Sequence, residues 1–361
     1  MNNPAPYGNN TPKEVMVMPE RISRNTIIMS RPPTIYSYSS TAGEKEGDGP
    51  LGKYFDEVSN DAYFGQKTWE KAESELMRRT AVRAIEKGGL SPEDIDLVFA
   101  GDLQNQCAAS TFALRELGIP MLGLYGACST MSESLLLGAL CTDSGAGDNI
   151  LCVTSSHFST AERQFRFPLS YGGVRTPTAQ WTCTASGAAV LSAETRPPYI
   201  KGVSIGKIVD MGVCDSSNMG AAMAPAAAYV IDAYLKDTGL SPEDFDCIVT
   251  GDLGKVGSSL LVDLMKKDGT DISGCHYDCG AMIFDSEEQD TRSGGSGCGC
   301  SGSVLCGYFL DRVKSGRIKN ILFCATGALM SVTASQQGES IPAVSHAVHI
   351  SFDAAPLRGK E

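Results

Sequence analysis

The sequence contains no hydrophobic run long enough to cross a membrane. Its longest strongly apolar stretch, near Ala221–Ile231, is far short of the ~20 residues that a membrane-spanning helix requires. The first residues, MNNPAPYGNNTPKE, also lack the apolar segment that a secretory signal peptide carries. We therefore expect a cytoplasmic protein.

Basic residues are outnumbered by acidic ones. The 361-residue chain has 30 Lys and Arg against 42 Asp and Glu, which gives a net charge of −12 and a pI near 4.9. This balance argues against nonspecific binding to nucleic acid and against unaided docking on anionic lipid. Attachment to a membrane is therefore expected to need a protein partner, and an anionic ligand a locally positive pocket.

Cysteine is abundant, with 13 residues. Because no signal peptide precedes them, we expect reduced thiols that are mostly buried as small hydrophobic side chains. The stretches CHYDC (275–279) and CGC (298–300) together offer four thiols and an imidazole. Their spacing matches no common zinc pattern, so the sequence predicts no metal centre.

A repeat with an offset of 150 residues organises the chain. Residues 90–103 read LSPEDIDLVFAGDL and residues 240–253 read LSPEDFDCIVTGDL, with nine of 14 positions identical. Each copy follows a helical segment that ends in a glycine, Gly88 or Gly239, where a C-terminal cap is expected. In each copy the aspartates lead into a short apolar run that is typical of a buried strand.

The similarity extends along both halves of the chain. The further matching stretches are GACSTMSESLLLGAL (126–140) with GCGCSGSVLCGYFL (297–310), and NILCVTSS (149–156) with NILFCATG (320–327). This alignment pairs Cys128 with Cys300. We predict a duplicated α/β unit with a largely parallel sheet. The expected divisions are a flexible arm at 1–24, a first half at 25–195 and a second half at 196–361.

Cys128 follows a small-residue turn, at the point where a long apolar helix is expected to begin. Unpaired backbone N–H groups and the helix dipole lower the pKa of a thiol in that position. The same N–H groups also bind anions. The pattern therefore fits a catalytic thiolate or an anion-binding turn. A third interpretation is a small buried residue that allows tight helix packing.

A duplicated α/β unit whose central helix opens with a cysteine resembles the thiolase fold. NMGAAMAPAAA (218–228) is similar to a thiolase signature, SGCGCSG (296–302) to the His-Pro-x-Gly-x-Ser-Gly loop, and FCATGAL (323–329) to the Cys-x-Gly-Gly-Gly strand end. GACST is similar to the nucleophile turn of ketoacyl synthases. The resemblance implies an α/β, thiolase-like fold of duplicated αβαβα layers, with two halves related by a pseudo-twofold axis.

A more specific resemblance is to the stage V sporulation protein AD family of spore-forming bacteria. It rests on the stretches GACST, TSSH, TAERQFRFP, YGG, MGAAMAPAAA, GGSGCGCS and ATGAL. The resemblance implies a thiolase-like homodimer that binds dipicolinic acid (pyridine-2,6-dicarboxylic acid). It further implies cooperation with membrane proteins of the same sporulation transport complex, which load this compound into the developing spore. The expected location is cytoplasmic and peripheral to the spore inner membrane, with no role for nucleic acid.

The resemblance also implies binding without catalysis. In thiolases the His of the His-Pro loop acts beside the cysteine, and Ser296 stands at that position here. A serine cannot serve as a general base near neutral pH. Cys324 matches the second thiolase cysteine. The alternative is an active thiolase or ketoacyl-synthase-type acyltransferase that uses Cys128, and a third hypothesis is a scaffold with a vestigial pocket.

A site for dipicolinate, which is a flat dianion, is expected to combine cationic or N–H donors with apolar walls. Arg163 and Arg166 have the spacing of one helical face, although they could equally pair with Glu162 or with a second subunit. The glycines of 293–302 expose successive N–H groups, so we expect two helix N-termini to converge on one cleft. The predicted ligand-binding residues are Cys128, Ser129, His157, Arg163, Arg166, Asp252, Ser296, Cys300 and Cys324.

Calcium could accompany the dicarboxylate, although no other cofactor is expected. The carboxylates that would then contribute are Glu133, Asp102 and Asp252. Asp102 and Asp252 occupy equivalent positions after the repeated strand, and their alternative role is to cap the next helix.

Overall fold

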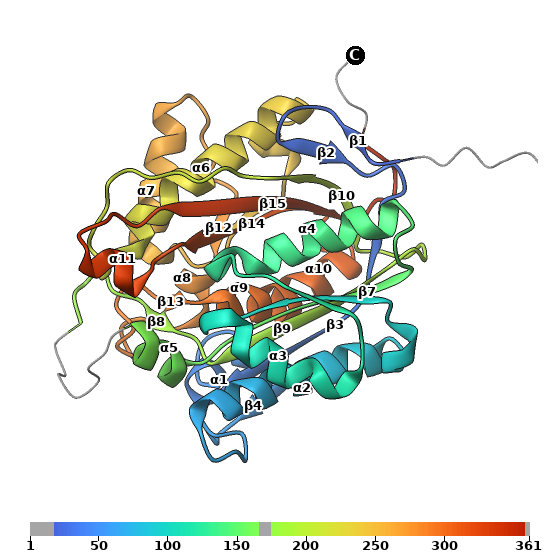
Figure 1. Cartoon of the computed structure of the whole chain (residues 1–361). Helices are drawn as coiled ribbons and strands as arrows, with labels where there is room; N and C mark the ends of the chain where they lie inside the picture. The colour runs from blue at the N-terminus through green and yellow to red at the C-terminus, as the bar shows by residue number, and fades with distance from the viewer. Residues whose placement is uncertain (1–17, 166–174, 358–361) are drawn as a thin grey trace, which may run out of the picture.

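The two repeats form two sheets that are packed with helices in a computed structural model describing residues 18–165 and 175–357 (Figure 1). The strand order of the first-half sheet is β3 (Thr34–Gly43), β9 (Ala185–Ser192), β7 (Asn149–Ser156), β5 (Leu97–Gly101), β6 (Met121–Gly123). The order of the second-half sheet is β10 (Tyr199–Ser204), β15 (Ala343–Ser351), β14 (Asn320–Ala328), β11 (Cys247–Thr250), β12 (His276–Asp278). The matching orders confirm the predicted duplication. The sheets meet where Tyr199 pairs with Thr34.

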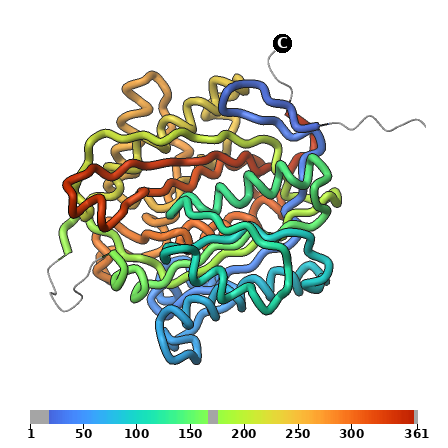
Figure 2. Tube along the Cα trace, viewed as in Figure 1, coloured from blue at the N-terminus to red at the C-terminus, as the bar shows by residue number. Residues whose placement is uncertain are grey.

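The prediction of a largely parallel sheet is wrong for the side of each half that lies next to the other half. β5 is parallel to β6 and β7, and β11 is parallel to β12 and β14. In contrast, β9 is antiparallel to β7 and β3, and β15 is antiparallel to β14 and β10. The repeated motifs cover only β5, β7, β11 and β14, so they report the parallel part alone. Figure 2 shows the last strand, in red, returning into the second-half sheet beside β14.

The layers follow the predicted αβαβα order (Figure 1). α2 (Trp69–Lys87) and α3 (Ala108–Leu114) cover the outer face of the first-half sheet, and α6 (Met219–Thr238) and α7 (Gly254–Lys267) cover that of the second. α4 (Thr130–Asp143) and α9 (Cys298–Val304) lie between the sheets. α9 is entirely buried and consists of Cys, Gly, Ser and one Val. The backbones of α9 and β9 lie so close together that side chains at their contact must be small. A Cβ on Gly187 of β9, for example, would lie 2.1 Å from the carbonyl carbon of Gly302 in α9.

The repeated LSPED sequence has a structural cause in both halves. Ser91 and Asp94 form a capping box, as do Ser241 and Asp244. Two residues further on, Asp96 accepts hydrogen bonds from the backbone at the start of β7, and its counterpart Asp246 does the same at β14. The motif therefore ties the loop before one strand to the beginning of its neighbour. Such local bonds depend on side-chain identity, which accounts for the close match between the copies.

Shorter elements complete the fold. They are β1 (Glu20–Arg21), β2 (Thr26–Ile28), β4 (Glu57–Ser59), β8 (Trp181–Thr182), β13 (Gly295–Ser296), α1 (Glu44–Gly47), α5 (Phe158–Phe165), α8 (Cys279–Ile283), α10 (Leu310–Lys314) and α11 (Val332–Gln336). β1 pairs with β2, so the end of the predicted arm belongs to a strand, and residues 1–17 lie outside the described residues. No helix in the described part of the chain combines the length and apolar character that crossing a bilayer requires.

Candidate ligand-binding site

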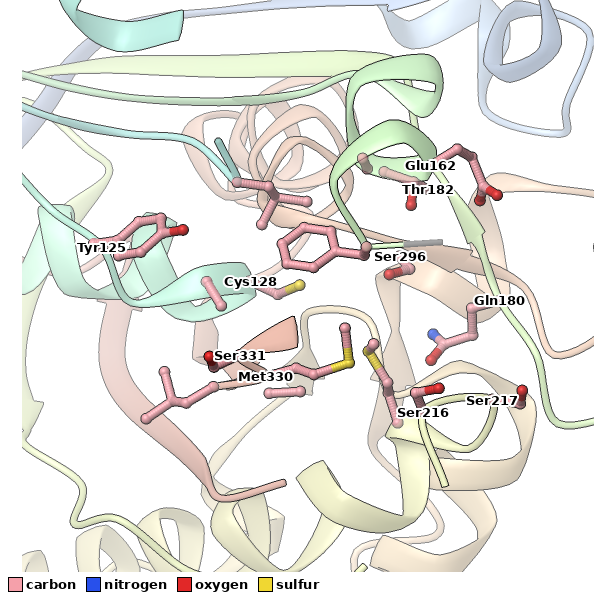
Figure 3. A pocket seen from close by; sticks show the side chains of 17 residues that line it. Tyr125, Cys128, Glu162, Gln180, Thr182, Ser216, Ser217, Ser296, Met330 and Ser331 are labelled. Atoms are coloured by element: carbon pink, nitrogen blue, oxygen red, sulfur yellow. The ribbon is translucent and has the colours of Figure 1, made fainter. Parts of the chain in front are cut away.

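A cavity of about 250 Å³ lies where the two halves meet, and side chains from both repeats line it (Figure 3). The Cys128 sulfur points towards Ser296 in this view. Hydroxyl groups of Thr182, Ser216 and Ser331 and the apolar side chains of Phe165, Met219 and Met330 share the lining. The cavity thus brings Cys128 of the first half and Ser296 of the second half together. This agrees with the expectation that the two halves meet at one cleft.

A strained turn presents Cys128. Ala127 has a φ of +50°, a left-handed conformation that is uncommon for residues other than glycine and costs on the order of 1 kcal/mol. Hydrogen bonds hold the turn, because Ser129 Oγ donates to the Gly126 carbonyl and Thr130 Oγ1 donates to the Ala127 carbonyl, each at 2.7 Å. Ser129 was predicted to bind the ligand, but it does not line the cavity and instead supports the turn.

The opposite wall is built from two short paired strands. β13, which carries Ser296, pairs in parallel with β8, which carries Thr182. Gln180, just before β8, donates from Nε2 to the Asp252 carbonyl at 2.6 Å and to the Gly295 carbonyl at 2.8 Å. Pairing of segments far apart in the sequence therefore fixes Ser296 opposite Cys128.

Asp252 lies directly behind Cys128 and Ser296 and is fully buried. Its Oδ2 accepts a hydrogen bond from the Gly297 N–H at 2.8 Å, whereas Oδ1 accepts none from the described residues. Burial raises the pKa of Asp252 to about 7, although the Cys128 thiol, the Gly297 N–H and the Ser296 hydroxyl partly offset this rise. The protonated form of this carboxyl group is therefore much more favourable than it is for an exposed aspartate.

The expectation that a helix start lowers the pKa of the Cys128 thiol is wrong. Burial raises that pKa well above its ordinary value, and the nearby negative charge of Asp252 raises it further. The N–H groups at the helix start are too weak to outweigh both effects. Cys128 is accordingly held as a neutral thiol.

None of the four histidines lines the cavity. His157, which was predicted to bind the ligand, donates from Nε2 to the Ala62 carbonyl at 2.8 Å and accepts at Nδ1 from the Ser159 N–H at 3.1 Å. Burial lowers its pKa. Both ring nitrogens are therefore used in holding the segment that starts α5, and no imidazole stands beside Cys128.

Of the two predicted arginines, Arg163 does not line the cavity. Arg163 forms an ion pair with Glu70 at 2.6 Å and lies over the Trp69 ring, while Arg166 lies outside the described residues. Arg175, which the sequence analysis did not select, donates to Glu162 at 3.2 Å and stacks on Trp181 at 4.6 Å. Its position beside a cavity-lining carboxylate depends on the pairing of β8 with β13, and the sequence gives no sign of that pairing.

The remaining predicted cysteines face elsewhere. Cys300 is the third residue of α9 and packs near Cys183. Cys128 instead lies before the first residue of α4, so Cys128 and Cys300 do not occupy equivalent positions. Cys324 faces the core between β14 and α6. Neither thiol lines the cavity, because strand and helix periodicity turns each side chain away from it.

The second helix start offers few free donors. The Gly297 N–H bonds to Asp252, and the Gly299 N–H bonds to Ser156 Oγ at 3.2 Å. The expectation that the glycine-rich loop supplies N–H groups to an anion is therefore wrong for these two positions. Asp102 likewise serves the fold: it accepts from Ser110 N–H at 2.8 Å and caps α3, as the alternative interpretation held. Glu133 does not line the cavity.

Comparison with known proteins settles the family. The sequence profile of the family described as Stage V sporulation protein AD (SpoVAD) matches residues 23–351. The chain belongs to the stage V sporulation protein AD family. It is 41% identical to Stage V sporulation protein AD of Bacillus subtilis (strain 168) over 325 residues, which cover 90% of this chain and 96% of that protein. The resemblance predicted from the motifs is thereby confirmed.

Solved structures agree on the fold. Human mitochondrial 3-ketoacyl-CoA thiolase in complex with CoA superposes with a TM-score of 0.58 at 14% identity, covering 91% of this chain and 99% of the thiolase. 3-Oxoacyl-[acyl-carrier-protein] synthase III from Aquifex aeolicus VF5 gives a TM-score of 0.54 at 14% identity, covering 89% of this chain and 100% of the synthase. The thiolase-like fold is therefore shown, and at these identities the likeness extends to the fold alone.

The state of Cys128 leads to a prediction about thiol reactivity. Under native conditions we expect iodoacetamide to label Cys214 first, because it is the exposed cysteine, and Cys128 slowly. The Asp252→Asn substitution removes the neighbouring negative charge and should speed Cys128 labelling, because the thiolate then forms more readily. Peptide mass spectrometry measures both rates, with Cys214 as the internal control. Equal labelling of Cys128 and Cys214 in the unmodified protein would contradict the assignment.

Proposed function

We propose that this protein binds dipicolinic acid without transforming it and serves uptake of that compound into the developing spore. The observation that carries the proposal is a small cavity in which Cys128 stands as a neutral thiol with no histidine beside it. Covalent acyl transfer needs an activated nucleophile and a base within hydrogen-bond reach. Membership of the sporulation family supports the biological setting.

The lining suits a flat dicarboxylate. Hydroxyl groups of Ser296, Thr182 and Ser216 are available as donors to carboxylate oxygens. Phe165 and Met330 supply apolar surface for an aromatic ring. The lining of this cavity of about 250 Å³ thus combines polar and apolar groups, which suits a small planar acid.

Isothermal titration calorimetry tests the proposal directly. Dipicolinate should bind with one site per chain, while picolinate, which has one carboxylate, and isophthalate, which lacks the ring nitrogen, should bind more weakly. The titrations are repeated with calcium and with a chelator, because a calcium-dependent heat would show that the ion enters with the ligand. Absence of heat at millimolar dipicolinate under both conditions would overturn the proposal.

The retained cysteine turn favours one other candidate, an acyltransferase of the thiolase or ketoacyl synthase type. Incubation with acyl-CoA followed by intact mass spectrometry distinguishes the two. We expect the mass to remain unchanged, because Cys128 lacks a base. An acyl adduct that disappears in the Cys128→Ser variant would establish the enzyme instead.

We propose that two copies associate through β6, which is an edge strand. Phe112, Leu122 and Tyr125 around it are 58%, 55% and 52% exposed, and an edge with exposed apolar side chains is suited to pairing with another chain. The Leu122→Lys substitution should shift the protein from dimer to monomer in sedimentation equilibrium. Leu260→Lys, at a 38% exposed leucine on α7, is the matched control and should leave the mass unchanged. A monomeric parent protein would contradict the pairing.

We also propose that the protein reaches the spore inner membrane through membrane proteins of the same sporulation complex. The net charge of −12 supports a protein receptor over an anionic lipid surface. Flotation with anionic vesicles that lack protein tests this directly, and recovery of the chain with such vesicles would contradict it.

A further inference from the structure

The cavity has little to neutralise a doubly charged ligand. Among the described residues, its one charged lining side chain is Glu162, and this carboxylate is engaged by Arg175 at 3.2 Å. The described lining contains no Lys, Arg or His. A dicarboxylate is therefore surrounded here by hydroxyl, thiol and apolar groups. The affinity of the cavity for such a ligand then depends strongly on whether an acid behind these groups is charged.

Asp252 is a buried acid that stands behind the lining. It touches the cavity wall through Cys128 and Ser296, both of which influence its carboxyl group. It is fully buried, no salt bridge reaches it from the described residues, and its Oδ1 accepts no hydrogen bond there. An ionised Asp252 would face an incoming carboxylate across two small side chains and repel it.

The neighbouring buried acid, Asp278, is more fully hydrogen-bonded, although burial still raises its pKa to about 6. It accepts hydrogen bonds from Thr250 Oγ1 at 2.7 Å and from the N–H groups of Leu253, Gly254 and Ala281, each at 2.9 Å. Asp252 accepts one backbone hydrogen bond, from Gly297, against three at Asp278. Of the two acids, Asp278 is therefore the better site for a negative charge, and Asp252 is the better site for a proton.

The other titratable groups around Asp252 are thiols rather than cations. They are Cys128, Cys183, Cys279, Cys298 and Cys300, and burial raises the pKa of each. None of them supplies a positive charge at neutral pH. Among the described residues, Asp252 is therefore a group whose protonation would lower the negative charge of the site in its ligand-bound form.

We propose that the cavity takes up its anionic ligand together with a proton, which Asp252 carries. The proposal rests on the proposed function and specifies how the same site is regulated. A protonated Asp252 donates its O–H towards the Cys128 sulfur or the Ser296 oxygen, so that the thiol or hydroxyl hydrogen is free to face the ligand carboxylate. The proton comes from solution, and no covalent bond to the ligand forms.

The direction of the pH dependence follows from linkage. Ligand binding raises the pKa of Asp252, so affinity is greatest where the free protein already holds the proton. With a free-state pKa of about 7, affinity should be flat below that pH and fall about tenfold for each unit above it. Dipicolinate stays ionised over this pH range, because carboxyl groups ordinarily titrate near pH 4. Titration of the ligand therefore does not contribute to the pH dependence of the affinity.

Calorimetry in buffers of different ionisation enthalpy measures the proton directly. With dipicolinate as the probe, we expect uptake of close to one proton per ligand at about pH 8.5, and little uptake at about pH 6. The affinity should fall about 30-fold between these two values, as 1.5 units above the free pKa implies. Binding that occurs without proton uptake at the higher pH would overturn the inference while leaving the proposed function intact. Absence of binding at every pH would instead remove the proposed function.

The Asp252→Asn variant supplies a second test. An amide has the shape of the acid and still accepts from Gly297, but it cannot ionise. This variant should bind dipicolinate at about pH 8.5 as tightly as the parent protein does at about pH 6, with no proton uptake. Asp102→Asn is the matched control, because Asp102 holds the equivalent repeat position but caps α3, and it should keep the parental pH dependence. If the affinity of Asp252→Asn still fell with rising pH as in the parent protein, the inference would be overturned. Binding that occurs only when calcium is present would overturn it as well.

Discussion

Replacing Ser296 with tryptophan should abolish the proposed dipicolinate binding and leave the fold intact: this is the largest effect expected on function. Ser296 lines the cavity opposite Cys128 (Figure 3), and an indole there occupies the space that a planar ligand needs. We expect the affinity to fall at least about 100-fold, which is about 2.7 kcal/mol. The melting temperature should change by only a few degrees, because the added ring enters an existing cavity.

Ser259→Trp is the matched control for that experiment. Ser259 is exposed on α7 and does not line the cavity, so the same change of residue should leave dipicolinate affinity unaltered. Calorimetry on both variants measures the difference. Undiminished binding by Ser296→Trp would show that the ligand occupies a different place on the protein.

Gly327→Ala should cause the largest loss of stability. A Cβ at this position in β14 would lie 2.1 Å from the Gly126 carbonyl oxygen and 3.3 Å from the Cys128 nitrogen. The strand and the cysteine turn would have to separate, which costs about 2–3 kcal/mol in a packed interior. For a chain of this size we expect the melting temperature to fall by roughly 3–4 °C, and the proposed dipicolinate affinity to fall with it because Cys128 is displaced.

Gly274→Ala tests whether the effect is specific to that contact. A Cβ on Gly274 would meet no atom within 4 Å, so its melting temperature should stay within about 1 °C of the parent, as for most surface changes. Differential scanning calorimetry compares the two variants. If Gly327→Ala melts at the parental temperature, the clamp between β14 and the cysteine turn has no energetic role.

Local signals predicted the repeated parts of the fold well. The run DLVFAG corresponds to β5 and NILCVTSS to β7, and each has its counterpart in β11 and β14. Gly239 ends α6 in the left-handed conformation, as predicted, whereas Gly88 is right-handed and the following Gly89 takes a φ of +70°. These features depend on a few neighbouring residues, which is why sequence patterns report them.

Features that depend on long-range pairing escaped prediction. The antiparallel insertion of β9 and β15 follows from sheet topology, and no motif marks it. The same holds for the site: Gln180 and Thr182 reach the cavity because β8 pairs with β13 across more than 100 residues. Cys300 and Cys324 do not line the cavity, because the motif gives their position along the chain and not the side to which the side chain turns.

The sign of an electrostatic effect also required the structure. The sequence places Cys128 at a helix start, which favours a low pKa. Full burial and the charge of Asp252 reverse that expectation, and neither the burial nor the contact between Cys128 and Asp252 can be deduced from residues 124 positions apart. The same reversal is what supports binding over catalysis at this site.

A crystal structure with dipicolinate at saturating concentration tests the central claim most directly. The account predicts density for an intact, unbonded dicarboxylate beside the Cys128 sulfur and Ser296, with Asp252 close behind. An empty cavity with the ligand bound elsewhere, or a covalent bond from the Cys128 sulfur, would contradict it.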